Sequence, residues 1–186
     1  QLSYDEYLAR DLKVADATGF EALNGLGVRW AIGGSLASAA HGEPRSTNDV
    51  DVIAELSEGG ARRFVELLGA SFYADAEVAA EAVRAETSFN VIDQRSFIKI
   101  DVFVPAAGPL GLGQLDRAKA LDVIPGAPAL PLLGPEDTVL QKLRWYRIGG
   151  EVSDRQWRDI VSVVRQSSER MDHAYLDEVA GPAGLG

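Results

Sequence analysis

Two strand-like segments of this chain carry aspartates inside otherwise apolar runs. The segment NDVDVI places Asp49 and Asp51 two residues apart, and the segment SFIKIDVFV places Asp101 among Phe, Ile and Val. Alternate residues of a strand share a face, so Asp49 and Asp51 are predicted to point the same way, while Val50 and Val52 turn towards a core. Carboxylates on one face repel one another, and we therefore expect a cation between them.

A turn rich in glycine lies just before the first pair of aspartates. The apolar run VRWAI is followed by Gly33, Gly34 and Ser35, and then by a short helical segment that ends near Gly42. The free N–H groups at a helix N-terminus favour an anion, usually phosphate, and glycines allow it to approach closely. The turn lacks both the Lys-Ser/Thr end of a P-loop and the G-x-G-x-x-G spacing. Taken alone, Gly-Gly-Ser is weak evidence for a phosphate site and favours a plain tight turn.

The acidic residues predict a magnesium or manganese site. Asp49, Asp51 and Asp101 supply hard oxygen ligands, and neither His nor Cys belongs to the cluster. Oxygen-only ligand sets suit Mg²⁺ and Mn²⁺. In the alternative interpretation, Asp49 and Asp51 are solvated on a half-exposed strand. Lys99, on the same strand face as Asp101, then neutralises that buried carboxylate.

The order of these features resembles the nucleotidyltransferase fold of the polymerase-beta type. That family's pattern is h-G-[GS], a short helix and [DE]-h-[DE], with a third carboxylate on a neighbouring strand. Here the pattern falls on Gly34 and Ser35, on Asp49 and Asp51, and on Asp101. The resemblance implies an α+β fold, with a small mixed β-sheet flanked by helices and followed by a C-terminal helical region.

The resemblance also implies a reaction, in which a nucleoside monophosphate moves from an NTP to a hydroxyl. The three aspartates would ligate two Mg²⁺ ions, with Mn²⁺ as a substitute, and Asp101 would help to activate the acceptor hydroxyl. In-line attack on the α-phosphate develops charge on the entering and leaving oxygens, and two ions roughly 3.5–4 Å apart stabilise both. The nucleotide-binding residues expected are Gly33, Gly34, Ser35, Arg45, Thr47 and Lys142. For Arg45 and Thr47, which precede Asp49, a role in shaping the loop is an equal alternative.

Longer segments resemble the abortive-infection (AbiEii-type) branch of bacterial minimal nucleotidyltransferases. They are HGEPRSTNDVDV, SFNVID with IKIDVFV, and PEDTVLQKLRWYR with RQWRDIV, and they cover most of residues 28–165. Several members of the branch are toxins of toxin–antitoxin pairs that modify tRNA or protein. The resemblance implies that Lys142 reaches the nucleotide phosphates; pairing with Asp159 is the alternative. The implied partners are an NTP, an acceptor RNA or protein, and a cognate antitoxin protein.

Charge and hydropathy restrict the partners. The net charge of −10 argues against a general affinity for nucleic acid, so DNA is not expected. Residues 141–165 nevertheless hold six Lys or Arg against three Asp or Glu, which favours an RNA acceptor or is simply a solvated helix face. No apolar run approaches the roughly 20 residues of a membrane span, and we expect a cytoplasmic protein. A small aminoglycoside-like acceptor is one alternative, because antibiotic nucleotidyltransferases share the core motif. A non-catalytic binding module is a second alternative.

The pattern of turns divides the chain into three parts. Residues 1–104 are predicted to form the α/β core, with a helix from Ser3, a helix from Ser57 to Leu68 and a hairpin of SFNVID and SFIKIDVFV. Residues 105–134, rich in Pro and Gly, are expected to contain at most a short helix and one strand. Residues 135–186 are predicted to form a helical region packed on the core, with Pro135 beginning one helix and Ser153 capping the next.

Overall fold

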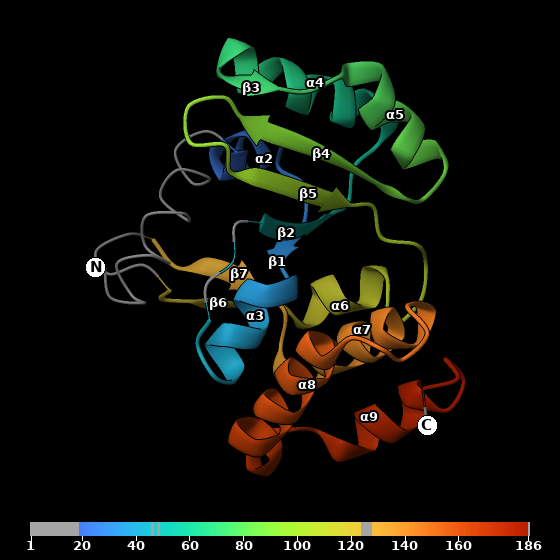
Figure 1. The fold of residues 1–186 in the computed structure, drawn as a ribbon. Helices are drawn as coiled ribbons and strands as arrows, with labels where there is room; N and C mark the ends of the chain where they lie inside the picture. The colour runs from blue at the N-terminus through green and yellow to red at the C-terminus, as the bar shows by residue number, and fades with distance from the viewer. Residues whose placement is uncertain (1–18, 46, 48, 124–127, 186) are drawn as a thin grey trace, which may run out of the picture.

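The chain forms a mixed β-sheet of seven strands with helices on both faces (Figure 1), in a computed structural model that describes residues 19–45, 47, 49–123 and 128–185. The helix predicted from Ser3 lies outside the described residues. The strand order is β3-β4-β5-β2-β1-β7-β6. The strands are β1 (Trp30–Ile32), β2 (Asp49–Ala54), β3 (Phe72–Tyr73), β4 (Ser88–Asp93), β5 (Lys99–Phe103), β6 (Lys119–Leu121) and β7 (Leu130–Leu132).

The two strands that carry the aspartates are neighbours in the sheet. Strands β2 and β5 run parallel, with Asp51 opposite Asp101 and Asp49 opposite Lys99. Strand β1 runs antiparallel to β2, so the turn after β1 lies beside the first half of β2. The N–H of Gly33 donates to the carbonyl oxygen of Asp51 over 2.9 Å. This topology brings the glycine turn and the acids of both strands to one place.

The predicted alternation of the acidic strands is confirmed. Val50 and Val52 of β2 are buried, as are Ile100 and Val102 of β5. They belong to the main core, together with side chains of helices α2 (Glu21–Leu26), α4 (Glu58–Leu68) and α5 (Ala76–Arg84). Ser57 caps α4 by accepting a hydrogen bond from the N–H of Gly60, as its position predicts. The apolar face of the sheet is therefore covered, and the acids face the opposite side.

The opposite face is covered by a second group of helices (Figure 1). They are α3 (Gly34–His41), α6 (Leu112–Arg117), α7 (Pro135–Ile148), α8 (Asp154–Ser167) and α9 (His173–Ala180). Pro135 lies in the first turn of α7, and Ser153 caps α8 by accepting from the N–H of Gln156. Helix α3 packs against both α7 and α8. The C-terminal helices thus reach the strand face on which the acids lie.

The connection over residues 105–134 contributes more to the sheet than its sequence predicts. It contains α6 and two strands, β6 and β7, where at most one strand was expected. The two strands pair antiparallel with each other, and β7 also pairs with β1. Each is only three residues long, too short for alternation to stand out in a segment rich in Pro and Gly.

Within the described ranges, no helix has the length and apolar character needed to cross a membrane.

Candidate active site

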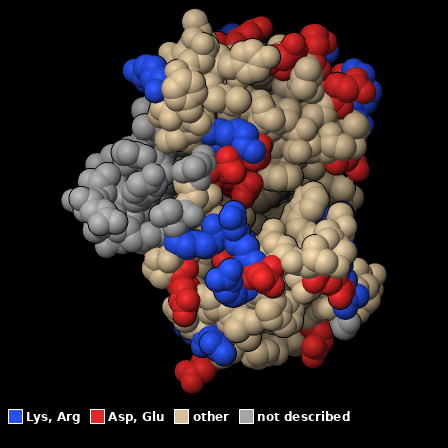
Figure 2. Space-filling view, viewed as in Figure 1, with Lys and Arg blue, Asp and Glu red and all other residues tan. Residues whose placement is uncertain are grey.

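Three aspartates and one lysine form a charged cluster on the face of β2 and β5 that points away from the main core. Asp51 and Asp101 lie directly opposite each other on neighbouring strands, and Asp49 begins β2. The Lys99 ammonium is 2.8 Å from Asp101 Oδ2 and 3.6 Å from Asp49 Oδ1. The pairing of Lys99 with Asp101, expected as the alternative to a metal, is therefore present. Figure 2 shows acidic and basic side chains meeting near the middle of this face, at the rim of a hollow.

The surroundings of Asp51 disfavour the charged form of its carboxyl group. Burial raises its pKa above the usual range, and the neighbouring charge of Asp101 raises it further. The positive charge of Lys142 and a hydrogen bond from the Ser35 N–H act in the opposite direction. An additional cation close to Asp51 and Asp101 would relieve this repulsion.

The chemistry of the cluster fits a hard divalent cation, although the side chains do not converge on one point. No group of three or more His, Cys, Asp or Glu side chains in the described part of the chain is arranged to hold a metal ion. Lys99 instead contacts two of the three carboxylates. All the donors are oxygens, and two of them are held in register on parallel strands. The assignment of Asp49, Asp51 and Asp101 as metal ligands stays a prediction.

The turn after β1 accepts only glycine at its second position. Gly34 has φ of +55°, and a Cβ built there would lie 1.7 Å from Asp51 Oδ2. Any side chain at this position would both strain the backbone and displace the carboxylate. Gly34 is also the first residue of α3, whose N-terminus therefore opens directly beside Asp51. The turn predicted for phosphates and the aspartate predicted for metal are in contact.

A cluster of opposite charges joins this turn to the C-terminal helices. The Arg45 guanidinium donates two hydrogen bonds to Asp159, from Nε over 2.9 Å and from Nη2 over 2.7 Å. Nη2 of Arg45 also donates to Ser35 Oγ over 2.5 Å. Lys142 Nζ donates to Asp159 Oδ2 over 2.8 Å and to Gln156 Oε1 over 3.1 Å. Asp159 therefore holds two cations within reach of the helix α3 N-terminus.

The environment shifts the pKa of both members of the central pair. Burial raises the pKa of Asp159, but the bonds from Arg45 and Lys142 outweigh this effect and hold it below the usual value. Burial lowers the pKa of Lys142, and the bond to Asp159 restores only part of the difference. Lys142 pairs with Asp159, which was the alternative interpretation, and it also lines the pocket beside Asp51. Its contact with nucleotide phosphates stays a prediction.

The loop before β2 is held by local hydrogen bonds. The Thr47 hydroxyl donates to the Asp49 carbonyl over 3.2 Å and lies 3.4 Å from the Asp49 N–H. Thr47 thus shapes the entry to β2, which was one of its two predicted roles. At the other end of the same loop, His41 Nε2 lies 2.8 Å from the carbonyl oxygen of Leu133.

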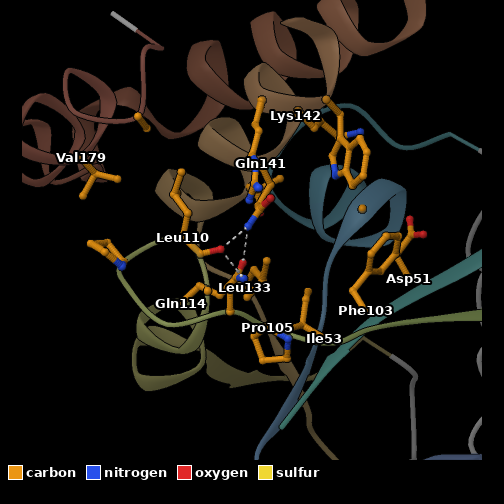
Figure 3. Close-up of a pocket in the computed structure, with 18 of the residues that line it drawn as sticks. Asp51, Ile53, Phe103, Pro105, Leu110, Gln114, Leu133, Gln141, Lys142 and Val179 are labelled. Atoms are coloured by element: carbon orange, nitrogen blue, oxygen red, sulfur yellow. Dashed lines mark hydrogen bonds between the residues drawn. The ribbon is translucent and has the colours of Figure 1, made fainter. Parts of the chain in front are cut away.

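A pocket of about 1030 Å³ opens next to Asp51. One end is formed by Gly34, Ser35, Asp51 and Lys142. The rest is mainly apolar, and Figure 3 shows the labelled side chains that surround it, from β2, β5, the 105–114 segment, α7 and α9. These apolar lining residues include Ile53, Phe103, Pro105, Leu110, Leu133 and Val179. Sequence reasoning missed this wall, because apolar residues that come together from distant strands, turns and helices carry no local signal for a ligand.

Sequence reasoning also missed the group that anchors α9 against the pocket. Asp137 is buried, and Arg117 donates to it from Nε over 2.9 Å and from Nη2 over 2.7 Å. The Tyr175 hydroxyl donates to Asp137 over 2.8 Å, and the Arg117 guanidinium lies 4.1 Å from the centre of the Tyr175 ring. The position of Asp137 in a first helical turn appeared sufficient to account for an acid. The structure gives it a second role as the joint of α6, α7 and α9.

Comparison with solved structures shows that this chain has the nucleotidyltransferase fold. The solution structure of the antibiotic-resistance factor ANT(2'')-Ia is similar with a TM-score of 0.62 and 16% identity, over 95% of this chain and 92% of that one. A crystal structure of ANT(2'')-Ia in complex with adenylyl-2''-tobramycin is similar with a TM-score of 0.59 and 14% identity, over 92% and 95%.

A third similar structure is that of a Thermotoga maritima protein described as a nucleotidyltransferase. Its TM-score is 0.52 and its identity 18%, over 80% of this chain and 92% of that one. No protein-family model matches the chain, and a search of curated proteins finds no match. The fold predicted from the aspartate and glycine motifs is therefore confirmed.

Proposed function

We propose that the chain is a magnesium-dependent nucleotidyltransferase that moves a nucleoside monophosphate from an NTP to a hydroxyl. The observation that carries the proposal is the pairing of Asp51 with Asp101 on parallel strands, beside the turn that places Gly34 against Asp51. These partly buried carboxylates repel each other, and a further cation between them would offset that repulsion. The N-terminus of α3 lies next to them and favours the phosphates that would accompany that cation.

Each of the chain's own groups has a task in this scheme. The α3 N-terminus and the Ser35 hydroxyl bind phosphate oxygens, and Lys142 adds positive charge at the same end of the pocket. Arg45, which donates to the Ser35 hydroxyl, adds a second positive charge beside it. Asp101 lies next to Asp51 and orients the acceptor hydroxyl towards the α-phosphate. Asp49, Asp51 and Asp101 are the residues that would hold Mg²⁺. The bound ion would stabilise charge on the entering and leaving oxygens.

For the acceptor, we propose a tRNA end or a protein hydroxyl, in a toxin-like role of the AbiEii type with a cognate antitoxin. The support is the sequence resemblance described above and the basic residues that gather on α7 and α8. An antibiotic acceptor is the alternative, which the sequence resemblance favours less. An aminoglycoside carries several positive charges, and the charged lining of the pocket (Asp51, Glu86 and Glu178 with Lys142 and Arg144) has one more negative than positive charge, which is compatible with such an acceptor.

The direct test uses NTPs labelled with ³²P at the α-phosphate, Mg²⁺ and a cell extract separated into RNA and protein. We expect label to appear in one of the two fractions with the wild type and to be absent with Asp51→Asn. The matched control is Asp75→Asn, which changes an acid that caps α5 away from the site. This control is expected to transfer label like the wild type.

Two results would contradict the proposal. If no NTP transfers label but Mg·NTP binds the wild type and not Asp51→Asn, the chain is a non-catalytic nucleotide-binding module. If Asp51→Asn transfers label as well as the wild type does, the carboxylates are not the reaction centre. Label on added tobramycin, with none on RNA or protein, would move the acceptor assignment to antibiotics.

A further inference from the structure

Two glutamines and one backbone carbonyl form a polar network in the otherwise apolar part of the pocket. Gln141 Nε2 donates to the Leu110 carbonyl over 2.7 Å and to Gln114 Oε1 over 3.1 Å. Gln114, which is buried, donates from its own Nε2 to the same Leu110 carbonyl over 2.9 Å. Figure 3 shows the Gln141 amide directed at Leu110 and Gln114. All three residues line the pocket that begins at Ser35 and Lys142.

This network fixes which way each amide points. A backbone carbonyl only accepts hydrogen bonds, so both amides must turn an N–H towards Leu110. Reversing Gln141 would place its oxygen 2.7 Å from the Leu110 oxygen and would lose the bond to Gln114. Both N–H groups of Gln141 are consequently committed within the protein. Its Oε1 accepts no hydrogen bond from any residue that the structure describes.

We propose that Gln141 is a specificity-determining residue that accepts a hydrogen bond from the amino group of the incoming nucleobase. The inference rests on the proposed function, because it places the nucleoside of the NTP in the apolar pocket beyond the phosphate turn. Gln141 immediately precedes Lys142 on α7, and both line the pocket, so phosphates bound at Lys142 would bring the nucleoside to this wall. Flat apolar surfaces and one oriented acceptor suit an aromatic base.

An acceptor in a fixed orientation discriminates between bases. At C6 of adenine and C4 of cytosine the base carries an amino group, which is a donor, whereas guanine at C6 and uracil at C4 carry a carbonyl oxygen. That carbonyl would face Gln141 Oε1 without a proton between them. A base without any donor at this position would leave the glutamine oxygen unsatisfied, and such sites reject analogues strongly. We therefore expect ATP or CTP to be preferred over GTP and UTP.

The test measures dissociation constants by calorimetry for the whole chain with Mg²⁺ and no acceptor. The ligands are the four NTPs, purine riboside triphosphate, 2-pyrimidinone riboside triphosphate and inorganic tripolyphosphate. The last three lack an amino donor, and tripolyphosphate lacks the base altogether. The wild type should bind ATP or CTP roughly tenfold more tightly than its amino-free analogue. Gln141→Leu should bind each such pair equally, while its tripolyphosphate affinity stays at the wild-type value.

The control variant is Gln94→Leu, the same substitution at an exposed glutamine that bonds Ala70. It should keep the wild-type preference. Equal binding of amino and amino-free nucleotides by the wild type would overturn the inference, as would an unchanged preference in Gln141→Leu. A loss in Gln141→Leu that tripolyphosphate shares would show that the residue only supports the pocket, and would also overturn it. If the wild type binds neither nucleotides nor tripolyphosphate, the proposed function itself fails.

Discussion

At the scale of single residues, Gly34 links the phosphate turn to the carboxylates. Replacement by alanine should lower the free energy of unfolding by about 2–4 kcal/mol, because φ is +55° and the new Cβ would meet Asp51 Oδ2 at 1.7 Å. Nucleotide binding should be lost as well, since Asp51 must move. Urea unfolding and calorimetry measure the two effects.

Gly59→Ala is the matched control for this substitution. Gly59 lies inside α4, and nothing is within 4 Å of the position that its Cβ would take. Alanine is the better helix former by roughly 1 kcal/mol, so the control should be as stable as the wild type or more stable. Wild-type stability and binding in Gly34→Ala would show that the turn is not fixed by its contact with Asp51.

Asp159 controls the pH range over which Lys142 can bind an anion. Burial lowers the pKa of Lys142, and Asp159 opposes that shift, so Asp159→Asn should lower the pKa further. Phosphate binding needs the ammonium form and disappears as the pH rises through the folded-state pKa. The loss of tripolyphosphate binding should therefore occur at lower pH in Asp159→Asn than in the wild type.

Stability follows the opposite trend with pH in this variant. Between the lowered pKa of Lys142 and its usual value, the unfolded chain binds the additional proton, so the free energy of unfolding should rise with pH. At neutral pH, Asp159→Asn should be less stable than the wild type by roughly 3 kcal/mol, because two cations lose their buried partner. Asp154→Asn, at the start of the same helix, is the control. Identical binding profiles for Asp159→Asn and the wild type would contradict this role.

At the scale of elements, helix α9 depends on one hydrogen-bonded joint. Burial and Asp137 raise the pKa of Tyr175, so its phenol stays protonated and donates to Asp137. Tyr175→Phe should destabilise the chain by about 1–2 kcal/mol and should increase hydrogen exchange over residues 173–180. Tyr73→Phe, at a tyrosine whose surface is 70% exposed, should change neither. Unchanged exchange in Tyr175→Phe would mean that apolar contacts alone hold α9.

The elements that the sequence predicts well are those with strong local patterns. Buried and less buried residues alternate at Asp49–Val52 of β2 and along β5, as predicted. Ser57 and Ser153 cap their helices, and Pro135 begins α7. Strands β6 and β7 were not both foreseen, because their pairing with each other and with β1 is a long-range contact. The Arg117–Asp137–Tyr175 joint was not foreseen for the same reason. The three aspartates of the site could be identified from the sequence, because charged residues are unusual within apolar strand segments.

At the scale of the whole molecule, the site joins the sheet to the C-terminal helices. Arg45 lies in the loop before β2 and Ser35 at the start of α3, while Asp159 and Lys142 belong to α8 and α7. A ligand that contacts both sides should therefore stabilise the whole fold. At about 100 times its dissociation constant, a non-hydrolysable Mg·NTP analogue should raise the melting temperature by roughly 5–10 °C.

Differential scanning calorimetry checks this expectation, with Asp51→Asn as the comparison. The variant should show little or no increase with the analogue. An equal increase in both proteins would mean that the analogue binds away from the carboxylates.

The most direct measurement compares transfer from NTPs labelled at the α-phosphate with transfer from NTPs labelled at the γ-phosphate. Nucleotidyl transfer leaves the α-phosphate on the acceptor and releases the γ-phosphate in pyrophosphate. We predict acceptor-bound label from α-labelled NTP alone, dependent on Mg²⁺ and absent in Asp51→Asn. Acceptor-bound label from γ-labelled NTP alone would show phosphoryl transfer, and would contradict the role assigned to the Asp51–Asp101 pair and the Gly34 turn.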